Sequence, residues 1–201
     1  MKKILFYIFL IISALAFLYP FIWMISASVA PENEIGSLTL FPSHLTFSSY
    51  QQMYDKIPIG KALVNSMIVA CSVTIGVLVF GSMIGYALSR LEFKGKNLIF
   101  YTIIFTMTLP FQITLIPQYI LMVRFGWVDT YLALIVPYFV NALSIIMFRQ
   151  YFKTIPQDLI DAARIDGCGE LEIIFRILWP NSIPAIVTIW IITFMASWKE
   201  V

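Results

Sequence analysis

Five long apolar runs alternate with polar segments along the chain. They cover residues 4–26, 63–88, 98–123, 131–148 and 183–198. A helix needs about 20 residues to cross the hydrocarbon core of a bilayer, so the first three runs are long enough, the fourth just qualifies and the fifth is short. The pattern predicts an all-α fold, a polytopic transmembrane helical bundle with five visible spans.

The first run has an alternative interpretation. A pair of lysines at positions 2–3 precedes it, and Ala14 and Ala16 give the small-x-small spacing of a cleaved secretory signal. The apolar run continues unbroken to Trp23, where a cleaved chain should turn polar. An uncleaved first helix is therefore favoured.

The fifth run is followed by three residues only, Lys199, Glu200 and Val201. A short span without a turn or a polar tail suggests a C-terminal truncation. We expect a single transmembrane domain over residues 1–201 that continues beyond the sequence given.

Composition supports a membrane protein. Hydrophobic residues make up 60% of the chain, charged residues make up 12%, and the mean hydropathy is +0.88, whereas soluble domains average about 45–50% apolar and about 25% charged. A net charge of +2 gives no basic excess of the size that nucleic-acid binding needs, so nucleic acid is excluded as a partner. Cys71 and Cys168 fall in the bilayer and the cytoplasm in the topology below, so no disulfide or cysteine-based metal site is expected.

Lysine and arginine set the expected orientation, since cytoplasmic loops carry an excess of both. With the N-terminus inside, nine of them lie on the cytoplasmic side and three lie outside. The inner group is Lys2, Lys3, Arg90, Lys94, Lys96, Arg149, Lys153, Arg164 and Arg176, and the outer group is Lys56, Lys61 and Arg124. We therefore expect a multi-pass plasma-membrane protein with a cytoplasmic N-terminus and a long cytoplasmic loop at residues 149–182.

None of the five runs contains Asp, Glu, Lys, Arg or His. Carriers driven by protons keep an ionisable group at depth in the membrane, so a proton relay within these runs is not expected. Gln112, Gln118 and Asn141 are candidate solute-pathway residues, because their amides can hydrogen-bond a polar solute. Hydrogen bonding between helices is the alternative for all three, and for Asn65 as well.

Nucleotide and catalytic chemistry find no support in the sequence. There is no GxxxxGK[ST] phosphate loop, and Gly167-Cys168-Gly169 fails the dinucleotide fingerprint because Glu172 stands where the third glycine should be. His44, the one histidine, is predicted outside and Cys168 inside, so they cannot form a nucleophilic pair. No catalytic, cofactor-binding or metal-ligating residue is predicted, and the chain is not expected to be an enzyme. Any ATP that drives transport must be bound by a partner subunit.

Small residues and prolines mark the second and third runs. Gly81 and Gly85 have the GxxxG spacing that lets helix backbones approach closely in lipid. Packing within the protein is favoured over self-dimerisation. Pro110 and Pro117 should each kink the third run. A kinked helix can line a cavity, or the kinks can serve packing alone.

Residues 151–180 form an amphipathic segment on the predicted inner side. Thr154 can cap a helix whose first turn holds Pro156 and Asp158. The expected apolar face of this helix consists of Leu159, Ala162 and Ala163. Gly167 is placed to end the helix in the left-handed conformation.

A second helix is expected from Gly169 onward, with Pro180 stopping it. Its apolar side chains have the i, i+3, i+4, i+7 spacing of one helix face. They are Leu171, Ile174, Phe175 and Leu178. The acidic residues of the segment would be repelled by anionic inner-leaflet lipid, which favours docking to another protein. These acids are Asp158, Asp161, Asp166, Glu170 and Glu172.

This segment resembles the EAA loop of permease subunits in binding-protein-dependent ABC importers, spaced EAA-x3-G-x9-I-x-L-P. The matching residues are Asp161, Ala162, Ala163, Gly167, Ile177 and Pro180. Two positions depart from the pattern, since Asp161 replaces the glutamate and Trp179 replaces the leucine before the proline. Aspartate keeps the charge. We call residues 151–180 the EAA loop.

The likeness extends over essentially the whole chain and is strongest from Leu109 to Pro184. It is similar to the carbohydrate-importer branch, and to the MalG-like one of its two permease subunits. The residues that carry it are Leu109-Pro110, Ile116-Pro117, Gly126-Trp127, Asp129-Thr130-Tyr131, Pro137-Tyr138, Phe148-Arg149 and Ala162-Ala163-Arg164-Ile165-Asp166-Gly167. The resemblance implies a MetI-like fold with six spanning helices, of which five are expected here.

The resemblance also implies a function and a set of partners. The chain would be a permease of the bacterial inner membrane that forms half of the pathway of an ATP-driven sugar or oligosaccharide importer. Its implied partners are a second permease subunit in a heterodimer, two ATPase subunits, an extracellular solute-binding protein, the carbohydrate substrate and the lipid bilayer.

The implied ATPase-coupling residues are Asp161, Ala162, Ala163, Asp166, Gly167 and Pro180. In this interpretation the alanines permit close docking, Gly167 gives the turn and Asp161 offers a charge-assisted contact to the ATPase. The alternative is that Ala162 and Ala163 pack against the protein's own spans. Two alternative functions also stay open, a permease for another solute such as a polyamine, glycerol phosphate or amino acid, and an inactive truncated membrane scaffold.

Overall fold

The structure is a computed structural model of the 201-residue chain, and it describes residues 2–36 and 41–200. Within these ranges every regular element is a helix, as the sequence predicts. The chain divides into two compact units, Met1–Leu63 and Val64–Val201, and each is described by itself.

The first unit holds α1 (Lys2–Ser28), η1 (Glu32–Glu34) and α2 (Ser48–Lys56). Helix α1 is long and apolar enough to cross a membrane, as predicted for the first run. Two hydrogen bonds tie the segment after α1 together, from the Thr46 amide to the Val29 carbonyl at 2.8 Å and from the Tyr50 hydroxyl to Ser28 Oγ at 3.0 Å.

Helix α3 (Ile59–Arg90) leads into the second unit and runs unbroken for 32 residues. Three glycines on its buried face lie directly against other parts of the unit. A Cβ atom built on Gly76 would meet the Phe139 ring, one on Gly81 would meet Ser144, and one on Gly85 would meet Phe148. The predicted close packing of the GxxxG face within the protein is therefore confirmed.

The third apolar run is not one continuous helix, and the kink predicted at Pro110 is confirmed as a sharp bend. It divides into α4 (Lys96–Thr106) and α5 (Phe111–Phe125), whose axes differ by 102°. Pro110 precedes α5 in an extended conformation, with φ −62° and ψ 136°. Proline also disfavours a helical conformation at the residue before it, here Leu109, so α4 does not continue into α5. Pro117 lies inside α5 and does not end it.

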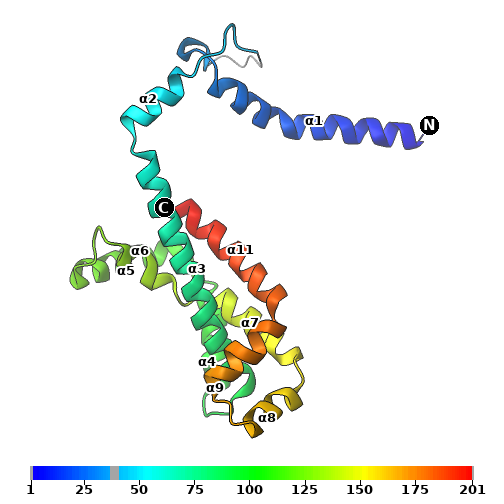
Figure 1. Cartoon of the computed structure of the whole chain (residues 1–201), viewed down its shortest axis with the longest axis vertical. Helices are drawn as coiled ribbons and strands as arrows, with labels where there is room; N and C mark the ends of the chain where they lie inside the picture. The colour runs from blue at the N-terminus through cyan, green and yellow to red at the C-terminus, as the bar shows by residue number, and fades with distance from the viewer. Residues whose placement is uncertain (1, 37–40, 201) are drawn as a thin grey trace. The chain divides into compact units, whose positions relative to one another are not determined.

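The fourth run is also interrupted. It forms α6 (Tyr131–Ile135), the 3₁₀ turn η2 (Val136–Tyr138) and α7 (Ala142–Thr154). Asn141 begins α7 as a side-chain cap, since its Oδ1 accepts a hydrogen bond from the Ser144 amide at 3.2 Å. In Figure 1, α7 lies close to both α4 and α11.

The EAA loop contains α8 (Gln157–Ile165), α9 (Glu170–Glu172), the π-helix η3 (Ile173–Leu178) and α10 (Trp179–Asn181), and α11 (Ile183–Glu200) follows. Three helices of the described residues can span a membrane by length and composition, and up to five can do so if each bent pair counts as one span. The predicted five spans match the upper number.

Two predictions about helix ends are wrong. Thr154 does not cap α8, because it is the last residue of α7 and its hydroxyl donates to the Tyr151 carbonyl at 2.7 Å. Pro156 takes the N-cap position instead. Pro180 does not stop the second helix, since it lies within α10 and the 90° bend into α11 comes at Ser182, where φ is −118°.

Candidate functional site

The first EAA helix, α8, has one buried and one exposed face. Ile160 is fully buried and Ala163 is 6% exposed, and both pack in the hydrophobic core of the second unit. Leu159 and Ala162, which the sequence analysis placed on the same face as Ala163, are exposed. The prediction of one shared apolar face is therefore corrected: Ala163 fixes α8 to its own chain, and Ala162 faces outward.

The exposed face of α8 combines apolar and acidic side chains. Ile165 is 86% exposed and Leu159 is 40% exposed, although both lie in a loop that is predicted to be outside the bilayer. Asp158, Asp161 and Asp166 are also exposed. An apolar centre bordered by charge is typical of a surface that another protein covers.

Gly167 makes the turn after α8, as predicted. Its φ is +88°, a region that residues with a Cβ rarely adopt, and a Cβ placed there would meet nothing within 4 Å. The Cys168 amide donates to the Ala163 carbonyl at 3.0 Å and the Gly167 amide donates to the Arg164 carbonyl at 3.1 Å, which satisfies the last carbonyls of α8. Backbone conformation, not space, requires glycine here.

The second EAA helix buries only part of the predicted set of side chains, together with one residue outside that set. Ile173, Ile174 and Leu178 are buried, whereas Leu171 is 57% exposed and Phe175 is 37% exposed. The cause is the π-helical winding of η3, which brings residues five apart onto one side, so that Ile173 and Leu178 point inward together. The i, i+3, i+4, i+7 prediction is confirmed for Ile174 and Leu178 and wrong for Leu171 and Phe175, because it assumes α-helical winding. Pro180, beyond η3, is exposed.

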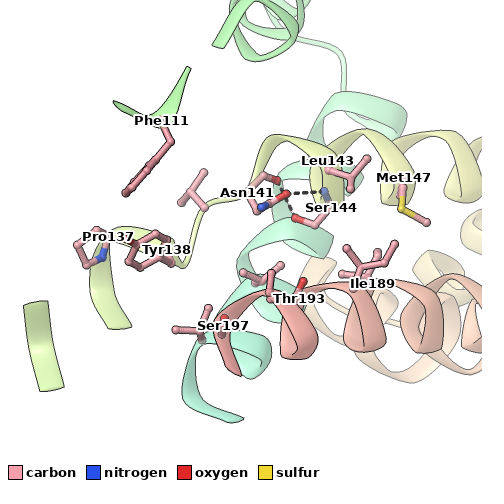
Figure 2. A pocket seen from close by; sticks show the side chains of 15 residues that line it. Phe111, Pro137, Tyr138, Asn141, Leu143, Ser144, Met147, Ile189, Thr193 and Ser197 are labelled. Atoms are coloured by element: carbon pink, nitrogen blue, oxygen red, sulfur yellow. Dashed lines mark hydrogen bonds between the residues drawn. The ribbon is translucent and has the colours of Figure 1, made fainter. Parts of the chain in front are cut away.

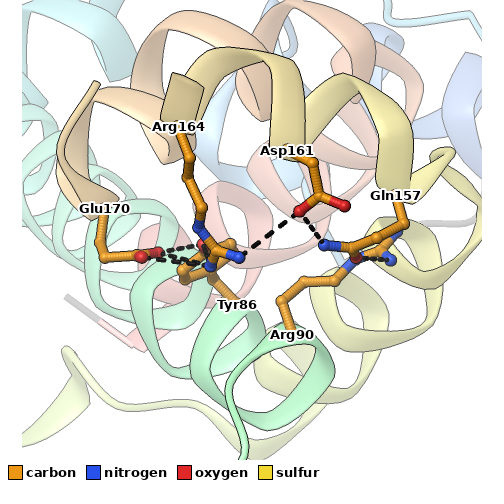
Figure 3. Close-up of polar contacts among 6 residues, drawn as sticks. All are labelled: Tyr86, Arg90, Gln157, Asp161, Arg164 and Glu170. Atoms are coloured by element: carbon orange, nitrogen blue, oxygen red, sulfur yellow. Dashed lines mark hydrogen bonds and ion pairs between the residues drawn. The ribbon is translucent and has the colours of Figure 1, made fainter. Parts of the chain in front are cut away.

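Six polar side chains join the EAA loop to the end of α3 (Figure 3). Arg164 lies between three partners: Glu170 Oε1 at 3.1 Å, the Tyr86 hydroxyl at 3.2 Å and Asp161 Oδ1 at 3.7 Å. The Tyr86 hydroxyl donates to Glu170 Oε2. This hydrogen bond, together with Arg164, holds the pKa of the Glu170 carboxyl below its ordinary value.

Arg90, the last residue of α3, makes the second polar contact to the loop. Its guanidinium donates to the carbonyls of Phe152 and Ile155 and to Gln157 Oε1 at 2.8 Å. A cation at this position satisfies carbonyls at the C-terminus of α7 and interacts favourably with the helix dipole. Gln157 Nε2 then donates to Asp161 Oδ1 at 2.9 Å, which connects the two groups of contacts.

A cavity of about 330 Å³ lies between α3, α7 and α11. Figure 2 shows Asn141 and Ser144 on one side and Ile189, Thr193 and Ser197 on the other. Phe111 and Tyr138 add aromatic rings to the wall, 6.5 Å apart between centroids. The described residues that line it carry hydroxyl, amide and apolar groups and no charge, a composition that suits an uncharged polar solute.

The three candidate solute-pathway residues do not lie together. Asn141 lines the cavity, but Gln112 and Gln118 on α5 are not among its lining residues. Gln112 is exposed and Gln118 is half-buried. Of the three, the structure places only Asn141 at a cavity wall, and there its Oδ1 also caps α7.

Residues 77–201 match the model of a protein family described as the inner membrane component of binding-protein-dependent transport systems. The chain belongs to this family. As a member, it is a multi-pass inner-membrane permease with the MetI-like fold.

This permease is similar to several known ones. It is 33% identical over 198 residues to the arabinooligosaccharides transport system permease protein AraQ of Bacillus subtilis, covering 96% of this chain and 70% of that protein. It is 32% identical over 194 residues to the diacetylchitobiose uptake system permease protein NgcG of Streptomyces coelicolor, covering 95% and 64%. It is 28% identical over 202 residues to the sn-glycerol-3-phosphate transport system permease protein UgpE of Pectobacterium atrosepticum, covering 96% and 72%.

Among solved structures, a bacterial ABC transporter involved in the import of the acidic polysaccharide alginate is similar to the permease. The TM-score is 0.86 and the sequence identity is 28%, over 98% of this chain and 71% of that one. The all-α fold of an ABC importer permease is thereby confirmed.

Sequence reasoning missed three residues that form or contact the EAA loop in this permease. Tyr86 and Arg90 belong to the second apolar run and its end, far from the EAA loop in sequence, so no local pattern connects them to it. Ile165 could have been found, because it lies on the side of α8 opposite Ile160, five residues further along a helix with a 3.6-residue repeat.

Proposed function

We propose that this permease forms half of the translocation pathway of an ATP-driven carbohydrate importer. A second permease subunit completes the pathway, two ATPase subunits supply the energy, and an extracellular solute-binding protein delivers the sugar. The single observation that carries the proposal is the exposed face of α8, which presents Ala162 and Ile165 among acidic side chains on a loop otherwise fixed to its own chain. The family and the relatives named above support the same function.

Within this proposal the EAA residues have separate tasks. Ala162 and Ile165 form the apolar centre of the ATPase contact, and Asp161 and Asp166 border it with negative charge. Ala163 holds α8 against the permease, Gly167 sets the angle between α8 and the following helix, and exposed Pro180 lies before the bend into α11. The alternative in which the alanines pack internally applies to Ala163 and not to Ala162.

We further propose that the cavity beside Asn141 belongs to the solute pathway. Its hydroxyl and amide groups can exchange hydrogen bonds with sugar hydroxyls, and its aromatic rings provide apolar walls. An anionic solute would need a cationic partner, and none lines the cavity among the described residues. Carbohydrate is therefore favoured over glycerol phosphate, the solute in the name of UgpE. Gln112 and Gln118 remain candidates for contacts on α5.

The orientation in the proposal places the N-terminus and the EAA loop in the cytoplasm. It rests on the nine-to-three distribution of lysine and arginine. In a variant without Cys71 and Cys168, a cysteine at Ser48 should react with an impermeant maleimide added to whole cells, and one at Gln157 should react only after permeabilisation. Reversed labelling would contradict this orientation and the coupling role of the loop.

Reconstituted uptake tests the function itself. Proteoliposomes would contain this permease with its partner permease, ATPases and binding protein, and would be offered an arabino-oligosaccharide, diacetylchitobiose or glycerol 3-phosphate. We expect uptake of a carbohydrate that requires ATP, the ATPases and the binding protein. Uptake of glycerol 3-phosphate alone would contradict the carbohydrate assignment. An assembled, ATP-hydrolysing complex that imports none of the three would support an inactive scaffold.

A further inference from the structure

Tyr86, Arg164 and Glu170 form a cluster that we call the latch. Tyr86 is 1% exposed and belongs to the hydrophobic core beside Phe148 and Phe152, yet its hydroxyl reaches Arg164 and Glu170 at the edge of that core. A buried tyrosine hydroxyl needs a hydrogen-bond partner, since an unsatisfied one is destabilising. The latch therefore has a buried end on α3 and a half-exposed end on the EAA loop (Figure 3).

The latch joins segments that are far apart in sequence. Tyr86 lies on α3, Arg164 on α8 and Glu170 at the start of α9, so the contacts bridge 78 and 84 residues. The turn at Gly167 lies between Arg164 and Glu170 in the sequence, so the latch holds the residues on both sides of this turn. Both helices of the EAA loop are thus tied to one side chain of α3.

Arg90, one helical turn further along α3, makes a second set of hydrogen bonds between α3 and the EAA loop. It holds the C-terminal carbonyls of α7 and reaches α8 through Gln157, and Asp161 connects Gln157 to Arg164. Asp161 thus makes its contacts to Gln157 and Arg164 within the loop. The latch and the contacts of Arg90 together fix α8 to the ends of both α3 and α7.

The same two helices form walls of the cavity. Val73 and Val77 line it from α3, and Asn141 and Met147 line it from α7. Tyr86 follows Val77 by nine residues of continuous helix, about 14 Å at 1.5 Å per residue. A shift of the EAA loop that the latch transmits to α3 would therefore move the cavity wall.

We propose that Tyr86, Arg164 and Glu170 are positioning residues that transmit ATPase-driven movement of the EAA loop to α3, a proposal that rests on the function proposed above. Apolar packing of Ile160, Ile173 and Leu178 holds the loop in place, but such contacts are not directional and permit sliding. Hydrogen bonds and the ion pair fix the angle between loop and helix. Without the latch, the ATPases should still bind and hydrolyse ATP, but hydrolysis should no longer drive transport.

The test compares matched variants of the complete transporter in proteoliposomes. Tyr86→Phe removes only the hydroxyl and keeps the buried ring. Arg164→Gln breaks the latch from the loop side, and Arg176→Gln is its control, since Arg176 is paired with Glu172 at 2.7 Å and is 72% exposed. The measurements are ATPase co-purification, the rate of ATP hydrolysis and the uptake of an arabino-oligosaccharide per ATP hydrolysed.

For Tyr86→Phe and Arg164→Gln we expect normal co-purification and retained hydrolysis, with uptake per ATP reduced by about tenfold, since a hydrogen bond to a charged group typically shifts an equilibrium by that factor or more. Arg176→Gln should match the wild type. Exchanging the charges, Arg164→Glu with Glu170→Arg, should restore part of the coupling that either single change removes. Restored coupling would exclude a purely structural effect of the single changes.

A further readout needs no transported solute. In the permease–ATPase complex, amide hydrogen exchange of residues 157–172 should become at least several-fold faster in Tyr86→Phe and stay unchanged in Arg176→Gln. Unchanged exchange together with unchanged coupling in Tyr86→Phe would overturn the latch. A wild-type complex that imports no carbohydrate would contradict the proposed function, and the exchange measurement would still decide whether the latch holds the loop.

Discussion

Replacement of Gly85 by alanine should force α3 and α7 apart. A Cβ at this position would lie 2.6 Å from Phe148 Cβ, 3.0 Å from the Arg149 backbone nitrogen and 3.2 Å from the Ile145 carbonyl oxygen. Two of these atoms belong to the backbone of α7, so no side-chain rotation relieves the clash. Overpacking of this kind typically costs about 1–3 kcal/mol.

A matched control isolates this cost. Gly60 lies on the same helix, and a Cβ there would meet nothing within 4 Å. Alanine is favoured over glycine in a helix interior by about 1 kcal/mol, a gain that applies in full at Gly85 and at most in part at Gly60, the second residue of α3. The comparison therefore understates the overpacking. An overpacking cost of about 2 kcal/mol still leaves Gly85→Ala about 1 kcal/mol less stable than Gly60→Ala.

The assay is the apparent thermal unfolding midpoint of the purified permease in detergent. At about 2–4 °C per kcal/mol for a chain of this size, Gly85→Ala should unfold at least 2 °C below Gly60→Ala. Gly76→Ala should be milder than its 2.0 Å clash suggests, because the clashing atoms belong to the Phe139 side chain, which can rotate. Equal midpoints for Gly85→Ala and Gly60→Ala would refute the close approach of α3 and α7.

Three further predictions concern the EAA loop. Gly167→Val should destabilise the permease by about 1–2 kcal/mol and weaken ATPase co-purification. Gly95 has nearly the same backbone angle, φ +86° against +88° for Gly167, so Gly95→Val should cost the same stability and leave ATPase co-purification unchanged. Equal ATPase binding in both variants would count against a role of Gly167 in setting the angle between the two helices. Ala163→Asp should destabilise the permease by about 3 kcal/mol or more by burying an unpaired charge. Ala162→Asp should cost only the helix-propensity difference, less than about 1 kcal/mol, while reducing ATPase binding. Similar midpoints for the two variants would contradict the assigned faces. Because the pKa of Glu170 is lowered, its stabilising contribution should be complete above about pH 4.5 and should decline as the pH falls through the lower folded-state pKa. The difference in unfolding midpoint between wild type and Glu170→Gln should therefore be constant from pH 7 to pH 5 and shrink below pH 5. A constant difference down to pH 3 would disprove the ionised contact.

Sequence alone predicted what depends on hydrophobic runs and on local backbone conformation. The α-helical class follows from apolar segments that are too long for strands, and the turn at Gly167 follows from the position of a glycine after an amphipathic helix. The close packing at Gly81 and Gly85 follows from their spacing. Each of these features is determined by residues within a few positions of one another.

Other features depend on longer-range structure and could not be predicted in this way. The bend at Pro110 measures 102°, while a proline in an apolar run is equally compatible with a mild kink. The π-helical winding of η3 brings Ile173 into the buried face and leaves Phe175 exposed, and no simple periodicity distinguishes a π-helix from an α-helix. Tyr86 meets Glu170 only after the fold brings together residues 84 positions apart.

Asp161 shows how a local motif and a long-range contact can use one side chain. The contacts to Gln157 and Arg164 both use Oδ1, and the side chain is 53% exposed, so Oδ2 is available to a partner outside the loop. A carboxylate has this capacity because each of its oxygens accepts hydrogen bonds. In the proposed importer, one oxygen of Asp161 would hold Arg164 in the latch while the other meets the ATPase, and a pull on this residue would pass through Arg164 to Tyr86 and α3.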